Sequence, residues 1–262
     1  MGKIRIGFHS DWSDSQLRLI KQMGATDIVA NLAGMGIGAV WPFEEMLKLR
    51  EKVEDHGLIL SVFETIGIPD RVKMGLPGRD EDIDNFCESV RNMGRAGIPA
   101  LCYNWMVHFN WLRTSTSTPI RGGATATGYN HKEFQRGPLT ELGEVEEGAL
   151  WDGLEYFLSA VIPVADEAGV KLAMHPDDPP LSPIRGIGRI MTSTESFQRL
   201  LDMSPSPNNG ITFCQGCFTE MGVDIPATIH HFASQGRIHF VHFRNLTGTA
   251  ENFTESFHDE GK

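Results

Sequence analysis

The sequence predicts an α/β protein of the (β/α)8 barrel class, a TIM barrel, that lacks its last strand–helix unit. Short apolar runs alternate with longer amphipathic segments along the 262 residues, which is typical of parallel strands joined by right-handed helical crossovers. No Gly-x-Gly-x-x-Gly follows the first apolar run, so a doubly wound nucleotide-binding sheet lacks its usual motif. Polar side chains end several of the runs, and in a barrel such strand ends meet on one face.

Seven apolar runs have the length and composition of strands. The predicted strands are Lys3–His9, Asp27–Leu32, Leu58–Glu64, Pro99–Trp105, Lys171–Pro176, Gly210–Gly216 and Ile238–Asn245. Only "LTGTAENFTESFHDEGK" follows the last of them, whereas a closed barrel would need roughly 40–60 further residues. We therefore expect residues 1–262 to form one barrel domain that is incomplete at its carboxyl end.

Amphipathic segments between these runs predict the helices. They cover residues 42–57, 80–97, 143–169, 192–203 and 224–236. The first opens with Pro42 and ends with Gly57, the usual start and stop residues of a helix.

Residues 106–142 have little periodicity and are rich in Thr, Ser and Gly. We expect a long loop insertion there, because a connection of this length is either functional or mobile. It follows a strand that ends in Asn104 and Trp105, which favours a lid or a subunit contact over a flexible surface segment.

The composition excludes several classes of function. The net charge is -11 and the pI is near 5.3, so nucleic acid and anionic membranes are poor partners. The apolar run near the amino end is too short for a signal peptide or a membrane span. Four cysteines in 262 residues do not form a disulfide framework, which indicates a reducing cytoplasm. An anionic small substrate would need a local positive centre, such as a metal ion or an arginine.

Three successive strands offer metal-ligand side chains at matching ends. Alternation in "KLAMHP" places Ala173 and His175 on one face. The next two runs end similarly, in Cys214 and His242. Imidazole and thiolate suit divalent transition metals, so we expect His175, Cys214 and His242 to form a metal site. Each histidine taken alone also fits a hydrogen-bonded structural role.

Cys214 and Cys217 form a CxxC pair, which leaves two other readings open. A zinc knuckle would need a second such pair, and a thioredoxin-like site would need the pair at a helix start. The sequence places this pair at a strand end.

The stretch "MHPDDPP" is a rigid turn, because two successive prolines stop a helix or an inner strand. Asp177 and Asp178 either support His175 and contact substrate hydroxyls, or serve as turn and cap residues. Arg244 either binds a substrate carboxylate in bidentate fashion or forms an internal salt bridge. Asn104 is a further candidate for substrate contact.

Several strings together resemble the mannonate dehydratase family over essentially the whole chain. They are "LSVFETI", "CYNWM", "LAMHPDDPP", "HFVHFRN" and "FHDEG", in the family's order. The resemblance implies a TIM barrel akin to the xylose isomerase-like group. It also implies loss of water from D-mannonate to give 2-dehydro-3-deoxy-D-gluconate in hexuronate catabolism, with Mn²⁺ as the usual metal and Fe²⁺ as the alternative.

The resemblance assigns metal ligation to His175, Cys214 and His242. It places a further ligand Asp and the acid–base His and Tyr beyond Lys262, so the catalytic residues stay unknown. His9, His108, His131 and His258 are candidates by default.

Two alternatives remain at this point. A sugar isomerase or epimerase on the same fold would want a carboxylate-rich site, and Glu64 is the single strand-end glutamate in a suitable place. A truncated, non-catalytic dehydratase would explain the missing unit. An open barrel exposes two strand edges, so we also expect a homo-oligomer.

Overall fold

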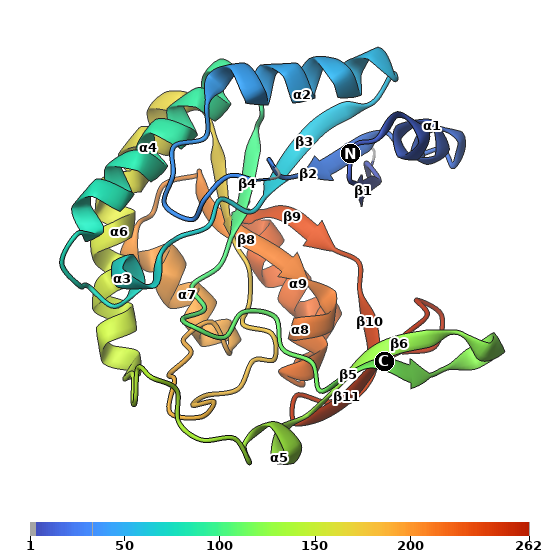
Figure 1. Cartoon of the computed structure of the whole chain (residues 1–262), viewed down its shortest axis with the longest axis vertical. Coiled ribbons are helices and arrows are strands. Elements are labelled where there is room, and N and C mark those ends of the chain that lie inside the picture. Colours follow the sequence, from blue (N-terminus) through green and yellow to red (C-terminus); the bar gives the residue numbers. More distant parts are fainter. Residues whose placement is uncertain (1–3, 33, 262) are drawn as a thin grey trace.

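The core of the molecule is a curved parallel sheet of seven strands (Figure 1). This computed structural model describes residues 4–32 and 34–261. In spatial order the strands are β1 (Gly7–His9), β2 (Asp27–Ala30), β3 (Ile59–Glu64), β4 (Ala100–Tyr103), β7 (Lys171–Met174), β8 (Asn209–Cys214) and β9 (Ile238–His242). Every neighbouring pair is parallel. The spatial order follows the chain without reversal, as in a barrel and unlike a doubly wound sheet. The seven predicted strands are confirmed, although Lys3 lies outside the described residues.

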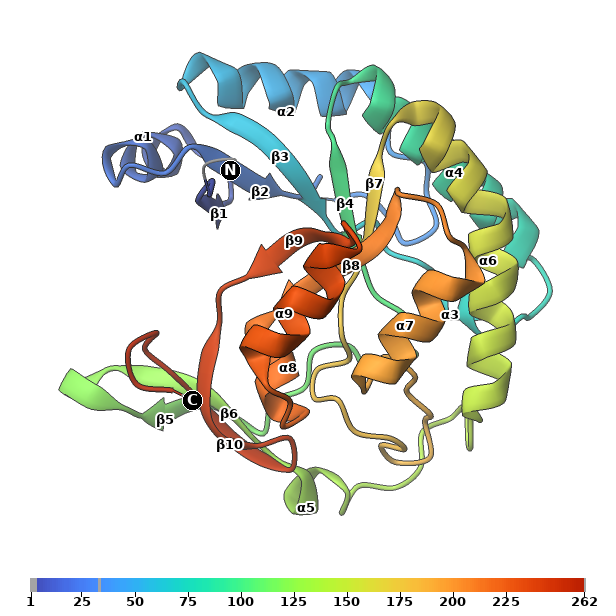
Figure 2. The same cartoon turned by 180° about the vertical axis from the view of Figure 1, so that it is seen from behind.

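Helices cover the outer face of this sheet (Figures 1 and 2). They are α1 (Asp14–Gln22), α2 (Phe43–Asp55), α3 (Asp70–Lys73), α4 (Arg79–Arg95), α6 (Glu147–Ala168), α7 (Thr194–Met203), α8 (Gln215–Glu220) and α9 (Ile225–Ser234). Local signals define their ends: Ser193 caps α7 by accepting from the Ser196 amide, and Asp224 caps α9 in the same way. Gly169 ends α6 at φ 67°, in the left-handed region that favours glycine.

Alternation along the strands separates two apolar cores. Leu172 and Met174 point outward into the large core beneath the helices. A smaller cluster fills the inner face and contains Val29, Val62, Ala100, Cys102 and the half-buried Phe240. The prediction for "KLAMHP" is therefore confirmed for the outward side chains, and a small residue at 173 leaves room inside.

A second, antiparallel sheet lies to one side of the barrel strands (Figures 1 and 2). Its order is β10 (Asn245–Thr249), β11 (Asn252–Ser256), β6 (Thr125–Asn130), β5 (Ser115–Pro119). The segment 106–142, expected to be a loop insertion, thus contains a hairpin, a short 3-10 turn (Arg121–Gly123) and α5 (His131–Phe134). Its strands escaped the sequence pattern because β6 pairs with β11 from the distant end of the chain. The predicted strand Ile238–Asn245 likewise stops at His242, and Asn245 begins β10.

The two outer strands of the parallel sheet are β1 and β9. Within the described residues β1 pairs only with β2, and β9 pairs only with β8. Val241 on β9 and Phe8 on β1 are 51% and 40% exposed, so apolar side chains lie along both edges. That the chain lacks a last strand–helix unit of a closed barrel stays a prediction.

Candidate active site

The carboxyl ends of four barrel strands bring four polar side chains together. His175 follows β7, Cys214 and His242 end β8 and β9, and Glu64 ends β3. The parallel register pairs Cys214 with His242 directly. We call His175, His242, Glu64 and Cys214 the histidine cluster.

The two imidazoles face each other across a short gap. His175 Nε2 lies 3.0 Å from His242 Nδ1. We call these two facing atoms the inner nitrogens, and the second nitrogen of each ring the outer nitrogen. Each outer nitrogen lies beside an acceptor: His175 Nδ1 is 2.7 Å from the Pro176 carbonyl oxygen, and His242 Nε2 is 2.9 Å from Glu64 Oε2. Because a carbonyl and a carboxylate only accept hydrogen bonds, each outer nitrogen carries a hydrogen. In the neutral rings both inner lone pairs therefore point at one another, and a cation between them would remove their repulsion.

Electrostatics around these rings favour a positive charge. Burial opposes ionisation of His242, but its hydrogen bonds with Cys214 and Glu64 outweigh that and raise its pKa to about 10. Burial also opposes ionisation of Glu64, yet the bond from His242 and the charges of His175 and His9 hold its pKa below the usual value.

Cys214 supplies a sulfur to the same place. The Cys217 thiol donates to the Cys214 sulfur, and this bond, with those from His175 and His242, holds the pKa of Cys214 well below its usual value although burial opposes it. Cys214 is 1% exposed. The ligand atoms of His175, Cys214 and Cys217 lie within 4.8 Å of one another, and so do those of Glu64, Cys102 and His242. Two facing imidazole lone pairs and a thiolate fit a divalent transition metal.

The turn "MHPDDPP" is held by hydrogen bonds and ion pairs on both aspartates. Asp177 Oδ2 accepts from the Met191 amide at 2.8 Å, and its other oxygen lies 3.5 Å from Arg189 Nε. Asp178 receives two bonds from Arg113, at 2.7 and 3.0 Å. Both aspartates are almost fully buried, so they fix the segment that carries His175.

Arg113 and Arg244 contact three carboxyl side chains, of which Asp178 and Glu220 are buried and Glu255 is partly exposed. We call Arg113, Arg244, Asp178, Glu220 and Glu255 the arginine network. Arg244 lies 3.1 Å from Asp178, 2.8 Å from Glu220 and 3.1 Å from Glu255, each through a different nitrogen. This geometry matches the salt-bridge alternative for Arg244. A bidentate contact with a substrate carboxylate would have to displace one of these partners.

Asn104 shapes the loop after β4. Its Oδ1 accepts from the Met106 amide at 3.2 Å, and its Nδ2 lies 3.4 Å from Asn110 Oδ1. Both hydrogen bonds join Asn104 to residues of its own loop.

The default acid–base candidates are spread across the molecule. His108 lies 3.5 Å from Glu141, His131 contacts the Tyr129 hydroxyl, and His258 contacts the Phe243 carbonyl. His9, at the end of β1, interacts with Glu64 through charge. His9 is therefore near enough to the histidine cluster to act on Glu64.

Comparison with known proteins identifies the family. The model of the family described as D-mannonate dehydratase (UxuA) matches residues 3–143 and 134–262. A mannonate dehydratase of Thermotoga maritima is 40% identical, over 92% of this chain and 76% of that protein. The chain belongs to the D-mannonate dehydratase family.

Solved structures agree with this assignment. The mannonate dehydratase of Streptococcus suis serotype 2 aligns with a TM-score of 0.88 at 35% identity, over 97% of this chain and 75% of that one. A xylose isomerase domain protein of Planctomyces limnophilus aligns with a TM-score of 0.59 at 12% identity, over 98% and 82%, which shows the fold alone. The α/β TIM-barrel class is thus confirmed for this dehydratase-family chain.

The sequence does not reveal several charged residues around these strand ends. Glu64 stands at a predicted strand end but has no assigned role in the metal site. Arg113, Glu220 and Glu255 were not singled out, and no local pattern marks them, because Arg113 and Glu255 meet across 142 positions. Burial, followed by the nearby Asp178 charge, raises the pKa of Glu220 to about 9, so this carboxyl keeps its proton at neutral pH.

The position of the CxxC pair also differs from expectation. Cys214 is both the last residue of β8 and the N-cap of α8. The pair therefore stands at a helix start as well as a strand end. A strand that passes directly into a helix leaves no loop between them for the sequence to reveal.

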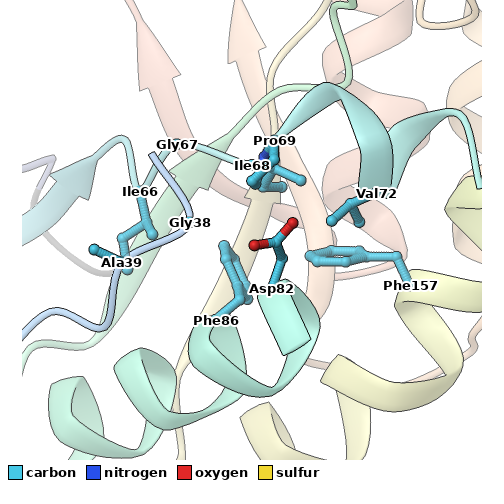
Figure 3. Close-up of a pocket in the computed structure, with 10 residues that line it drawn as sticks. All are labelled: Gly38, Ala39, Ile66, Gly67, Ile68, Pro69, Val72, Asp82, Phe86 and Phe157. Carbon is cyan, nitrogen blue, oxygen red and sulfur yellow. The ribbon is translucent and has the colours of Figure 1, made fainter. Parts of the chain in front are cut away.

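A small apolar hollow lies between the segment that follows β3 and the helices α3 and α4 (Figure 3). It is bordered by Ile66, Phe86 and Phe157 of the outer core. Its charged member, Asp82, is bound by Arg71. Since this region is part of the helix packing, we place the candidate site at the strand ends.

The described residues include no helix that is both long and apolar enough to cross a membrane.

Proposed function

We propose that this chain dehydrates D-mannonate to 2-dehydro-3-deoxy-D-gluconate in hexuronate catabolism, with a divalent metal at the histidine cluster. Membership of the D-mannonate dehydratase family supports the reaction. The observation that carries the site is the pair of facing lone pairs on His175 and His242 beside a buried thiolate.

The proposed metal ligands are His175, Cys214 and His242. Mn²⁺ is the proposed ion, as the resemblance to the family implies, with Fe²⁺, which imidazole suits, as the alternative. When bound, such a cation would offset the negative charge of the substrate carboxylate and of the oxygens as the C2 proton leaves. It would also counter the repulsion between an anionic sugar acid and a chain of net charge -11.

The protein's own residues prepare this site. Glu64 and the Pro176 carbonyl fix the ring tautomers, so that both inner nitrogens present lone pairs. Asp177 and Asp178 hold the turn in place through Arg189 and Arg113. The positions of the ligands are therefore set before a metal or substrate arrives, which lowers the cost of binding either.

A carboxylate-rich isomerase or epimerase site fits less well. The solved structures titled as epimerases or as a xylose isomerase domain protein match at 9–16% identity, which shows the fold alone. Glu64, the strand-end glutamate, binds His242 here.

The test is an assay of this chain with D-mannonate and Mn²⁺, with and without a chelator, that follows the 2-keto-3-deoxy acid. Chelator-sensitive product formation supports the proposal. No product from D-mannonate, together with turnover of a ketose, would replace it with the isomerase or epimerase reading. No turnover of either, with Mn²⁺ still bound, would leave a non-catalytic relative.

We also propose a homo-oligomer and a cytoplasmic location. Apolar side chains along β1 and β9, such as Phe8 and Val241, are exposed at strand edges, and such edges favour association. Four buried free cysteines suit a reducing compartment. A monodisperse monomer in light scattering would count against the oligomer.

A further inference from the structure

The histidine cluster has a second sulfur neighbour that the proposed function does not use. Cys217 is fully buried in the first turn of α8, three residues after Cys214. Its sulfur lies within 4.8 Å of both the Cys214 sulfur and a ring nitrogen of His175. Three potential ligand atoms, two sulfurs and one nitrogen, are thus gathered at one point.

The placement of Cys217 follows from the backbone. Because β8 runs directly into α8 with Cys214 as the cap, the side chain three positions later turns back toward the strand end. Arg244 Nη1 lies 3.4 Å from the Cys217 sulfur, so a positive group already faces it. That neighbour would stabilise a sulfur that becomes negatively charged when it binds a cation.

Metal ions differ in how much a second sulfur ligand increases their affinity for a site. Thiolates select soft or borderline cations such as Zn²⁺, whereas Mn²⁺ prefers oxygen ligands. Zinc also accepts four tetrahedral ligands from cysteine and histidine. A site that offers two cysteine sulfurs and an imidazole nitrogen therefore suits Zn²⁺ better than it suits Mn²⁺.

We propose that Cys217 is an additional ligand for Zn²⁺ and related thiophilic cations, beside Cys214 and His175, and that it takes no part in holding Mn²⁺. The Cys217 thiol releases its proton to solvent as its sulfur binds. This inference rests on the proposed metal site. It makes Cys217 the residue that sets the preference of the site between Zn²⁺ and the ion proposed for the reaction.

The experiment compares metal affinities of the full chain freed of metal. Zn²⁺ and Mn²⁺ are titrated into the natural sequence and into Cys217→Ser. Co²⁺ serves as an optical probe, since absorption by thiolate-to-cobalt charge transfer grows with the number of bound thiolates. We expect Cys217→Ser to weaken Zn²⁺ binding at least about tenfold, the lower range for lost support of a metal ligand. We expect its Mn²⁺ affinity to stay within twofold, and the charge-transfer band per Co²⁺ to fall by about half.

Two control variants test whether the effect is specific to Cys217. Cys87→Ser changes another buried cysteine, on α4, whose thiol donates to the Ala160 carbonyl, and it should alter neither affinity. Cys102→Ala removes the sulfur grouped with Glu64 and His242. If this variant, rather than Cys217→Ser, diminished the cobalt band, the assignment to Cys217 would be overturned.

The outcomes separate this inference from the proposed function. If the natural chain bound no Mn²⁺, the proposed metal site itself would fail. If it bound Mn²⁺ while Cys217→Ser left Zn²⁺ affinity and the cobalt band unchanged, only the role of Cys217 would fail. If Cys217→Ser weakened Zn²⁺ and Mn²⁺ binding equally, Cys217 would support the fold of the site and would not set its metal preference. Thermal melting of each variant establishes that it is folded.

Discussion

The histidine cluster and the arginine network lie buried near one another, yet they satisfy their polar groups in different ways. In the arginine network Arg113 and Arg244 face Asp178 and Glu255, while Glu220, with its pKa raised to about 9, keeps its proton. Two positive groups meet two negative groups at neutral pH. The charges of the network therefore balance without any ligand, although Glu220 Oε2 has no hydrogen-bond partner among the described residues.

In the histidine cluster, by contrast, two nitrogen lone pairs face each other. The inner nitrogens of His175 and His242 point at each other at 3.0 Å while their outer nitrogens are held by fixed acceptors. Only a proton or another cation between them satisfies both. The comparison teaches that a network whose charges balance among its own residues indicates a structural role, whereas converging lone pairs indicate a binding site.

The largest effect should come from breaking the arginine network. Arg113 is 2% exposed at its side chain, and Arg113→Met leaves Asp178 and Glu255 with fewer positive partners in the interior. We expect a loss of about 3–5 kcal/mol in the free energy of unfolding, measured by denaturant titration. The control is Arg121→Met, which removes an exposed pair with Asp259 and should cost less than about 1 kcal/mol. Equal losses in the two variants would contradict the difference in burial.

The next effect should separate binding from stability in the histidine cluster. His175→Ala removes one of the two facing nitrogens, and we expect Mn²⁺ affinity to fall by about 100-fold or more, with a much smaller change in the melting temperature than in Arg113→Met. Calorimetric titration measures the affinity. His231→Ala, on the surface of α9 with a bond to Gln198, is the control. Unchanged Mn²⁺ affinity in His175→Ala would remove this residue from the site.

A smaller effect should sharpen the role of Glu64. Glu64→Ala removes the acceptor that fixes the His242 tautomer, and we expect a 10- to 100-fold loss of Mn²⁺ affinity, roughly the usual cost of losing such a partner. Glu64→Gln keeps an oxygen that can accept from Nε2 and should lose less. Electron paramagnetic resonance of free Mn²⁺ follows both variants. If Gln and Ala weakened binding equally, the carboxylate charge rather than the tautomer would be the important property.

The smallest effect concerns His239, which lies on β9 on the face opposite to His242. Burial, together with the charges of Lys171 and Arg237, lowers the pKa of His239 to about 4. The unfolded chain then binds a proton below about pH 6.5, whereas the folded chain binds it only below about pH 4. The free energy of unfolding therefore decreases as the pH is lowered from about 6.5 to about 4. By pH 5 the loss relative to pH 8 is about 2 kcal/mol. His239→Leu should show a shallower acid dependence in urea titrations, and an unchanged slope would refute this origin.

Much of the fold could be predicted because it is encoded locally. Period-two and helical patterns predicted the seven strands and the helices α2, α4, α6, α7 and α9, but not α1 or the short α3, α5 and α8. In a barrel the carboxyl ends of the strands share one face, so His175, Cys214 and His242 could be grouped before any coordinates. The hairpin β5–β6 was missed because its Thr, Ser and Gly residues carry no apolar alternation, and its partner β11 comes more than a hundred residues later.

The sequence by itself therefore determined which elements form and which side chains stand at the strand ends, because periodicity and capping act between near neighbours along the chain. Only the tertiary structure decided how those side chains are used. It turned the inner nitrogens of His175 and His242 toward each other, directed Cys217 to the same point, and surrounded Arg244 with carboxylates. The physical reason is that these contacts join residues far apart in the chain, so their geometry depends on how whole elements pack.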